Sequence, residues 1–417
     1  MEVSYNLRYQ KSNFSNRLII DKEGEVIIYA KGFRLKGKGA NDKGELINFS
    51  DLKEFYSRED SIIFVTFTKE KYVLLDVGNL FDQLLIDIYK ARNEFLVDAL
   101  FMKKGKLKVE FEGNFERLSK FGKPINKGHA KIKLFEKSMV IIPQIQDAFF
   151  IHYDFVNFHE FDELDYLFKI VTDDGSTILI SQLGNDYEIF EEKMNELLGG
   201  MYESLVNDVL KGIFVEFHST TLLKFAYKMK GGKAVSLKEI QKIDKDLAKR
   251  VEEFIFEKTD FKEKIAGIEE FKHDENIYFG IAKDETINNG YIKWVMYSVP
   301  QKNIACFSIM PRFVKETDPK SKITEMFFYK IIIEQGDPVE KLENKICEIN
   351  QALIILSFSK DPCYKDKREL KHSPYKYAIR KLPFLRILRK SFVSKLLLDD
   401  KATCEKQIKE IFEKSKI

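Results

Sequence analysis

Residues whose types could bind a metal or act as acids and bases gather in one stretch of the chain. Imidazole and carboxylate groups suit zinc, manganese or iron. Here they alternate with Phe155, Phe158 and Phe161, which is the pattern of a strand with one aromatic face. A metal site, an acidic surface for a basic partner and a solvated strand face therefore stay open. The potential ligands are His152, Asp154, His159, Glu160, Asp162, Glu163 and Asp165, and the acidic surface would comprise Asp154, Glu160, Asp162, Glu163 and Asp165.

A glycine-containing stretch comes close to a nucleotide-binding loop. Residues 32–39 match the phosphate-loop pattern except that Gly39 stands where Ser or Thr would bind Mg²⁺. The surroundings predict strands, whereas the motif needs a helix whose N-terminus faces the phosphates. A basic strand and turn is the better interpretation, and it predicts either contact with an anionic ligand or a solvated loop. Its candidate contact residues are Lys31, Arg34, Lys36 and Lys38.

The most asymmetric segment is basic and lies near the C-terminus. Residues 360–395 hold twelve basic and three acidic side chains, a net charge of +9, so the rest of the chain carries about −6 (3 − 9). Basic groups there alternate with aromatic and aliphatic residues. An anionic membrane surface and a nucleic-acid backbone are both suitable partners. The third interpretation is a helical pair docked by its apolar face. The candidate contacts are Arg380, Lys381, Arg386, Arg389 and Lys390.

Signatures of catalysis and of export are missing from the sequence. No serine lies in a G-x-S-x-G elbow, and the four cysteines form no C-x-x-C pair. The N-terminal residues lack the basic and apolar regions of a signal peptide. No apolar run approaches the ~18 residues that a membrane-spanning helix needs. We therefore expect a soluble cytoplasmic protein that is not an enzyme and that binds no metal or cofactor.

A β-hairpin followed by a long helix occurs at least twice. The first copy is predicted at 61–67 and 72–77, with a helix over 80–100 whose leucines recur at three- and four-residue steps. The second copy is predicted at 166–171 and 177–183, with a helix that ends near residue 210. The Gly-Asn pairs that precede the two helices are 106 positions apart (184 − 78).

These patterns predict four parts of the chain. Two repeats of about seven short strands and one closing helix are followed by a divergent third copy with an inserted helix. A basic, mostly helical tail without strands ends the chain. The predicted boundaries are 1–107, 108–214, 215–358 with its inserted helix at 236–256, and 359–417.

Seven short antiparallel strands closed by one amphipathic helix resemble the pleckstrin-homology-like (PH-like) superfold. Residues 47–54 look like the middle strand of PH and GRAM-type modules, and residues 151–158 are similar. The resemblance implies an α+β chain of tandem small antiparallel β-barrels or sandwiches. It also implies binding of phosphoinositides, peptides or proteins, because such modules are rarely catalytic.

The expected function is that of an intracellular scaffold that binds a protein or an anionic ligand. One alternative is a nucleic-acid-associated protein that uses residues 360–395, which could equally meet an anionic membrane surface. The other alternative is an enzyme with a site between repeats.

Overall fold

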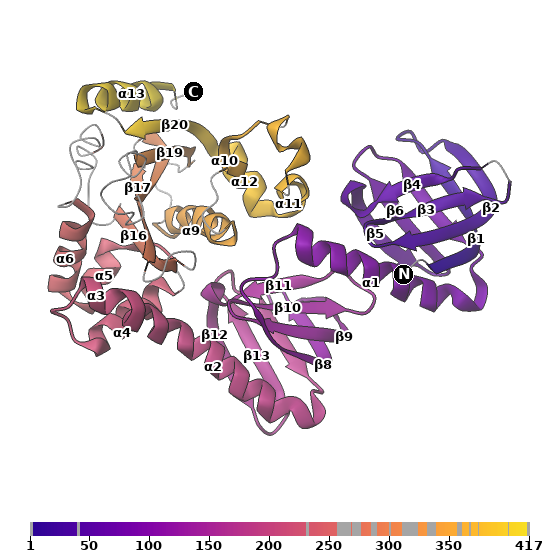
Figure 1. Cartoon of the computed structure of the whole chain (residues 1–417), viewed down its shortest axis with the longest axis horizontal. Coiled ribbons are helices and arrows are strands. Elements are labelled where there is room, and N and C mark those ends of the chain that lie inside the picture. Colours follow the sequence, from indigo (N-terminus) through magenta and orange to yellow (C-terminus); the bar gives the residue numbers. More distant parts are fainter. Residues whose placement is uncertain are drawn as a thin grey trace. The chain divides into compact units, whose positions relative to one another are not determined.

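The computed structural model is a mixed α+β chain with three antiparallel sheets in its described part (Figure 1). The chain forms two compact units, residues 1–193 (unit 1) and residues 194–417 (unit 2). The structure describes residues 3–39, 42–230, 233–256, 268, 277–284, 290–299, 302–310, 324–331, 339–356, 361–366, 368–373, 375–398 and 400–414.

The first sheet of unit 1 has seven antiparallel strands in the order β4-β3-β2-β1-β7-β6-β5. Apolar and polar residues alternate along them, so that Tyr5, Leu7 and Tyr9 are buried on one face while their neighbours face solvent. The strands are β1 (Val3–Ser12), β2 (Leu18–Tyr29), β3 (Gly32–Gly37), β4 (Glu45–Asn48), β5 (Leu52–Arg58), β6 (Ser61–Thr66) and β7 (Lys71–Leu75).

The helix α1 (Phe81–Ala99) covers the apolar face of this sheet. Leu84, Leu85 and Ile88 follow the predicted stripe and are buried against the strands. Tyr89 meets Phe55 of β5 edge to face, with ring centroids 4.8 Å apart. The hairpin and helix predicted at 61–100 are confirmed.

The second sheet of unit 1 repeats this plan. Its order is β11-β10-β9-β8-β14-β13-β12, which is the order of the first sheet shifted by seven strands. Phe190, in the helix α2 (Tyr187–Leu205), packs edge to face on Phe111 and Phe168, 5.2 Å away in each case. The strands are β8 (Leu107–Leu118), β9 (Pro124–Phe135), β10 (Ser138–Pro143), β11 (Phe149–His152), β12 (Val156–Asp162), β13 (Leu167–Thr172) and β14 (Thr177–Ser181).

Within the described residues neither of these sheets closes into a barrel, which is one of the two forms, barrel or sandwich, that the resemblance implied. A one-turn 3-10 helix at Phe49–Asp51 separates β4 from β5, and one at Tyr153–Phe155 separates β11 from β12. At the first corner the Phe49 amide donates to Lys31, and Asp51 accepts from Phe67. These bonds tie the corner to the turn between β2 and β3 and to the turn after β6. No ladder joins β4 to β5 in the described residues, so the sheet keeps two edges.

Unit 2 is built on a third antiparallel sheet whose six strands follow chain order, so it does not repeat the arrangement of the first two. The sequence predicts strands near 277–281, 291–297, 304–310 and 326–333, and β16 to β19 confirm them within the described residues. The strands are β15 (Val235–Ser236), β16 (Ile277–Asp284), β17 (Gly290–Val299), β18 (Ile304–Met310), β19 (Thr324–Lys330) and β20 (Phe392–Leu398).

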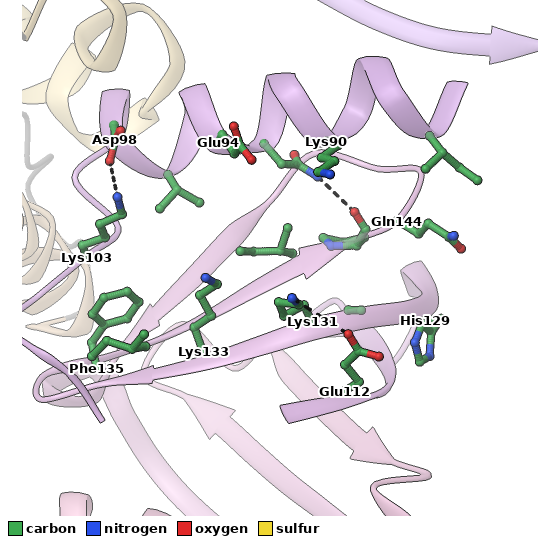
Figure 2. A pocket seen from close by; sticks show the side chains of 17 residues that line it. Lys90, Glu94, Asp98, Lys103, Glu112, His129, Lys131, Lys133, Phe135 and Gln144 are labelled. Carbon is green, nitrogen blue, oxygen red and sulfur yellow. Dashed lines mark hydrogen bonds and ion pairs between the residues drawn. The ribbon is translucent and has the colours of Figure 1, made fainter. Parts of the chain in front are cut away.

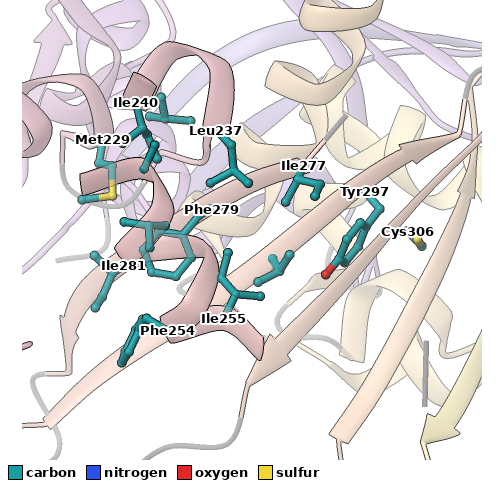
Figure 3. Close-up of a cluster of buried hydrophobic side chains, with 14 of the residues drawn as sticks. Met229, Leu237, Ile240, Phe254, Ile255, Ile277, Phe279, Ile281, Tyr297 and Cys306 are labelled. Atoms are coloured by element: carbon teal, nitrogen blue, oxygen red, sulfur yellow. The ribbon is translucent and has the colours of Figure 1, made fainter. Parts of the chain in front are cut away.

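Helices pack on this third sheet. Figure 3 shows Ile277, Phe279 and Ile281 of β16 lying against Leu237 and Ile240, which belong to α5. The helix α12 contacts both β19 and α9. The α-helices in the described part of unit 2 are α3 (Lys211–Ile213), α4 (Ser219–Met229), α5 (Leu237–Ile243), α6 (Lys245–Phe256), α9 (Val339–Ile355), α10 (Asp361–Tyr364), α11 (Tyr375–Lys381), α12 (Pro383–Ser391) and α13 (Lys401–Lys414). A π-helical turn at Val206–Leu210 continues α2.

Two predictions for the start of unit 2 need correction. The sequence predicts a strand at 227–230, but residues 227–229 lie in α4, because Leu222, Phe225 and Met229 are all buried at helical spacing. The inserted helix predicted at 236–256 is two helices, α5 and α6. Asp244 interrupts it, and its side chain accepts from the Leu247 amide at 3.0 Å.

The prediction of a strandless tail is wrong. Residues 392–398 form β20, which pairs antiparallel with β19 at the edge of the third sheet, and Leu396 is buried opposite Met326. The basic charge of the preceding segment concealed this short strand. The four predicted boundaries stay predictions. No helix of the described part has the length and apolar character that crossing a membrane requires.

Candidate functional site

A groove of about 890 Å³ lies in unit 1 between α1 and the strands β9 and β10. Figure 2 shows Lys90, Glu94 and Asp98 along the helix, facing the strands that carry Lys131 and Lys133. The wall between these charged rims is apolar. It is made by Ile86, Val97, Leu107, Ala130, Phe135, Ile142 and Pro143.

Two adjacent residues of α1, Arg92 and Asn93, hold the two sides of the groove together. The Arg92 side chain is fully buried, and its Nε and Nη2 donate to the two carboxylate oxygens of Asp147 at 2.6 and 2.7 Å. Asn93 donates from Nδ2 to the carbonyl oxygens of Pro143 and Gln146 at 3.0 and 2.9 Å, and its Oδ1 accepts from the Ala148 amide at 2.8 Å. The loop between β10 and β11 is therefore held on the first repeat's helix.

The charged groups of the groove largely neutralise one another. Lys133 donates to Glu110 at 2.8 Å, and this bond is the main reason why the Glu110 pKa lies below its usual value. Lys131 lies 3.9 Å from Glu112, and Lys103 lies 2.6 Å from Asp98. A groove with an apolar wall and paired charges suits a protein segment better than it suits an anion.

The first hairpin of each repeat ends in an exposed aromatic residue. Phe14, between β1 and β2, is 73% exposed, and Phe121, between β8 and β9, is 77% exposed. Leu18 and Ile125 beside them are also exposed, and both pairs are 107 positions apart (121 − 14 and 125 − 18). We call the residues 11–20 and 117–127 the hairpin tips.

The hairpin tips are basic and their turns are well ordered by hydrogen bonds. The first tip holds Arg17 and Lys11, of which Lys11 is paired with Glu45 and Glu70, and the second tip holds four basic side chains. Neither tip contains an acidic residue. In the first turn Asn13 Oδ1 accepts from the amides of Ser15 and Arg17 at 3.0 Å. In the second, the Lys120 ammonium lies 5.0 Å from the centroid of the Phe121 ring. The sequence did carry a signal for these residues, because Phe14 and Phe121 are 107 positions apart, which is close to the 106 positions between the two Gly-Asn pairs.

The structure spreads the basic strand of the first repeat along the outer face of its sheet. Lys36 lies 3.6 Å from Glu25, and Lys38 lies 2.5 Å from Glu23. The Arg34 guanidinium lies over the Tyr29 ring at 5.6 Å, while Lys31 is exposed in the turn after β2. Acidic residues of the neighbouring strand thus offset much of the charge that made this stretch a candidate.

The acidic candidates do not form one cluster. Asp154 is 1% exposed, and its Oδ2 lies 3.3 Å from Nδ1 of the buried His152. Asp162 instead orders the turn after β12, because its Oδ1 accepts from the Leu164 and Asp165 amides. Glu163 and Asp165 are exposed in that turn, and Glu160 lies 3.6 Å from Lys169. Across the residues whose placement is known, no group of three or more His, Cys, Asp or Glu side chains could hold a metal ion.

The basic C-terminal candidates lie on α11 and α12. Leu385 and Leu388 bury the apolar face of α12, and Arg389 donates to the Pro362 carbonyl at 2.6 Å. Lys381 lies over the Tyr377 ring at 6.0 Å. The structure therefore brings these residues together as a docked helical pair whose remaining cations, Arg380, Arg386 and Lys390, are exposed.

Comparisons of the sequence with protein-family models and with curated proteins gave no match.

Proposed function

We propose that the protein is a non-enzymatic interaction protein whose unit 1 binds an anionic membrane surface through the two hairpin tips. The observation that carries this proposal is the pair of exposed phenylalanines, Phe14 and Phe121, at the same place in two sheets of the same strand order. Isolated exposed apolar residues are common on protein surfaces. An exposed phenylalanine near basic residues that recurs at the same place in both repeats indicates a binding surface instead.

The chemistry of the tips fits a lipid headgroup region. A basic side chain near an anionic bilayer contributes roughly 1 kcal/mol, and an aromatic ring inserts readily at the boundary between headgroups and acyl chains. The tips are turns at the ends of hairpins, so they project from the sheets. A protein partner would need a matching pocket for each tip, but a deformable lipid surface accommodates both tips without such pockets.

The shared strand order also supports a PH-like assignment for the two repeats of unit 1. Each repeat has seven strands and a helix that covers the apolar face, as the resemblance implied. In this proposal the groove beside α1 receives a segment of a protein partner, because its wall is apolar and its rim charges are paired. The protein would then join a partner to a membrane surface.

The membrane proposal is tested with vesicles that contain about one-fifth phosphatidylserine. The double variant Phe14→Ser/Phe121→Ser removes both rings from solvent-exposed positions, so folding should be unaffected. We expect its partition coefficient in vesicle co-sedimentation to fall at least tenfold, because about 1.5–3 kcal/mol of apolar transfer is lost for each ring that inserts.

The matched control is Phe158→Ser, since Phe158 is a half-exposed phenylalanine beside Lys169 on another part of unit 1. This variant should bind vesicles as the unaltered protein does. Equal binding by the tip variant, or equal loss in the Phe158 variant, would contradict the proposal. Vesicles of neutral phosphatidylcholine alone should bind weakly, because the basic groups of the tips then gain nothing.

A further inference from the structure

The helical pair α11–α12 presents a face of one charge sign. Between Tyr375 and Ser391 the chain has six basic residues and no acidic one. Lys376, Arg380, Arg386 and Lys390 are exposed along the two helices. We call these four side chains the cationic face.

Four apolar residues of the pair are buried against unit 2 and are not available to a partner. Tyr377 and Ala378 of α11 and Leu385 and Leu388 of α12 are buried, none with more than 5% of its surface exposed. Arg389 fixes α12 further through its bond to the Pro362 carbonyl. An amphipathic helix that binds a membrane inserts its apolar face between lipids, and here that face already serves the core of unit 2.

We propose that the cationic face binds the phosphodiester backbone of a nucleic acid without reading its sequence. The cationic face provides positive charge, and its four side chains do not insert between lipids. A polyanion with regularly spaced phosphates is a partner that charge alone can bind. This binding activity is separate from the proposed membrane contact of unit 1 and uses none of its residues.

The proposal makes a quantitative statement about salt. If the four cations of the cationic face each neutralise one phosphate of a duplex, the logarithm of the affinity falls against the logarithm of the salt concentration with a slope of about −3.6. Loss of two cations changes this slope to about −1.8. At about 0.1 M salt, removal of two cations should lower the affinity on the order of 50-fold, and replacement of both by glutamate should lower it at least that much, because two like charges then face the phosphates.

The test uses the full chain and the double variant Arg386→Glu/Lys390→Glu, whose side chains lie in solvent on α12. Fluorescence anisotropy with a labelled 20-base-pair duplex is measured over a series of salt concentrations. The matched control is Lys406→Glu/Lys409→Glu, which makes the same change of net charge on the exposed side of α13. We expect the α12 variant to show the weaker affinity and the shallower slope, and the α13 variant to bind as the unaltered protein does.

Two further arms distinguish the sources of the phosphodiester. A DNA duplex and an RNA duplex of the same length should both bind if the backbone is what the cationic face contacts. Absence of binding to either, or an equal loss in the α13 variant, overturns the proposal. It is also overturned if the α12 variant keeps its duplex affinity but loses binding to phosphatidylserine vesicles, because the cationic face would then be a membrane contact.

Discussion

His152 is a neutral imidazole enclosed by protein. Burial lowers its pKa to about 4 from an ordinary value near 6.5, against the opposing attraction of Asp154, and the nearby Lys104 and Lys137 lower it further. Between pH 4 and 6.5 the unfolded chain therefore binds a proton at this residue that the folded chain does not. The free energy of unfolding falls as the pH drops through this window, because protonation favours the unfolded chain.

We predict that this one group removes about 3 kcal/mol of stability between pH 6.5 and pH 4. Urea unfolding at a series of pH values measures the loss, and the variant His152→Gln should lack this part of it because glutamine does not titrate. The idea fails if the two proteins lose stability in parallel across the window. The control is His159→Gln, a change at a half-buried histidine on β12, and this variant should still show the slope that His152 produces.

The sequence placed His152 and Asp154 among potential metal ligands, and the structure shows why spacing alone could not settle their role. Both residues lie at the corner between β11 and β12, where the chain leaves one edge of the sheet and starts the other. The environment of His152 at that corner includes Lys104, distant in the chain, whose charge lowers the His152 pKa. Local alternation predicts which face of a strand is apolar, but it carries no information on such contacts.

At the scale of elements, Asn93 joins a helix to a loop that is about fifty residues away in the chain. Its amide nitrogen donates to two carbonyl oxygens and its oxygen accepts from an amide. We predict that Asn93→Asp lowers the free energy of unfolding by roughly 3 kcal/mol, because a buried carboxylate oxygen would face the two carbonyls without a proton to donate.

Chemical denaturation followed by circular dichroism measures this change. The exposed Asn157 of β12 supplies the matched control, and Asn157→Asp should alter stability by less than about 0.5 kcal/mol. A similar small effect at Asn93 would show that the helix and the loop are not coupled through this side chain. The groove beside α1 should widen or lose its shape in the Asn93 variant, since the same bonds hold its two sides.

Gly280 is the second element-scale prediction. It lies on β16 directly opposite Trp294 of β17, and a Cβ built there would meet the indole at 2.3 Å. We predict that Gly280→Ala lowers the stability of unit 2 by about 1–3 kcal/mol, because the buried ring cannot yield without disturbing the core.

Trp294 is the only tryptophan in the sequence, so its fluorescence in urea reports the unfolding of unit 2 directly. Gly199 in α2 is exposed and has no neighbour within 4 Å of an added Cβ. Gly199→Ala should therefore raise stability by about 0.5–1 kcal/mol. If Gly280→Ala and Gly199→Ala shift the urea midpoint of unfolding in the same direction, close packing against the indole is not the reason why residue 280 is a glycine.

Elements with long, regular patterns were predictable, and elements defined by their surroundings were not. The stripe of Leu84, Leu85 and Ile88 gave α1 correctly because burial on one side of a helix imposes that spacing. Residues 227–230 were wrongly predicted as a strand, because four residues that mix apolar and basic side chains fit both the helical and the strand periodicity. The exposed phenylalanines of the hairpin tips had a visible repeat spacing, but only the structure showed that they lie at the ends of hairpins.

At the scale of the whole molecule, the two proposed binding activities use different units and should separate cleanly. We predict that Phe14→Ser/Phe121→Ser loses vesicle binding and keeps duplex affinity, while Arg386→Glu/Lys390→Glu does the reverse. The measurement is a paired assay of both variants on both ligands at one salt concentration. Loss of both activities in either variant would mean that the surfaces are not independent.

The strand β20 has a consequence for the order in which the protein is made. It pairs with β19, yet its first residue follows the last residue of β19 by 62 positions (392 − 330). At ~5–20 residues per second, a ribosome needs roughly 3–12 s to synthesise that interval. For this time the nascent chain carries β19 with a bare, hydrogen-bonding edge lined by Met326 and Phe328, which is the kind of surface on which chains pair wrongly. Unit 2 therefore finishes its sheet late in synthesis, when the sheets of unit 1 already have all their strands.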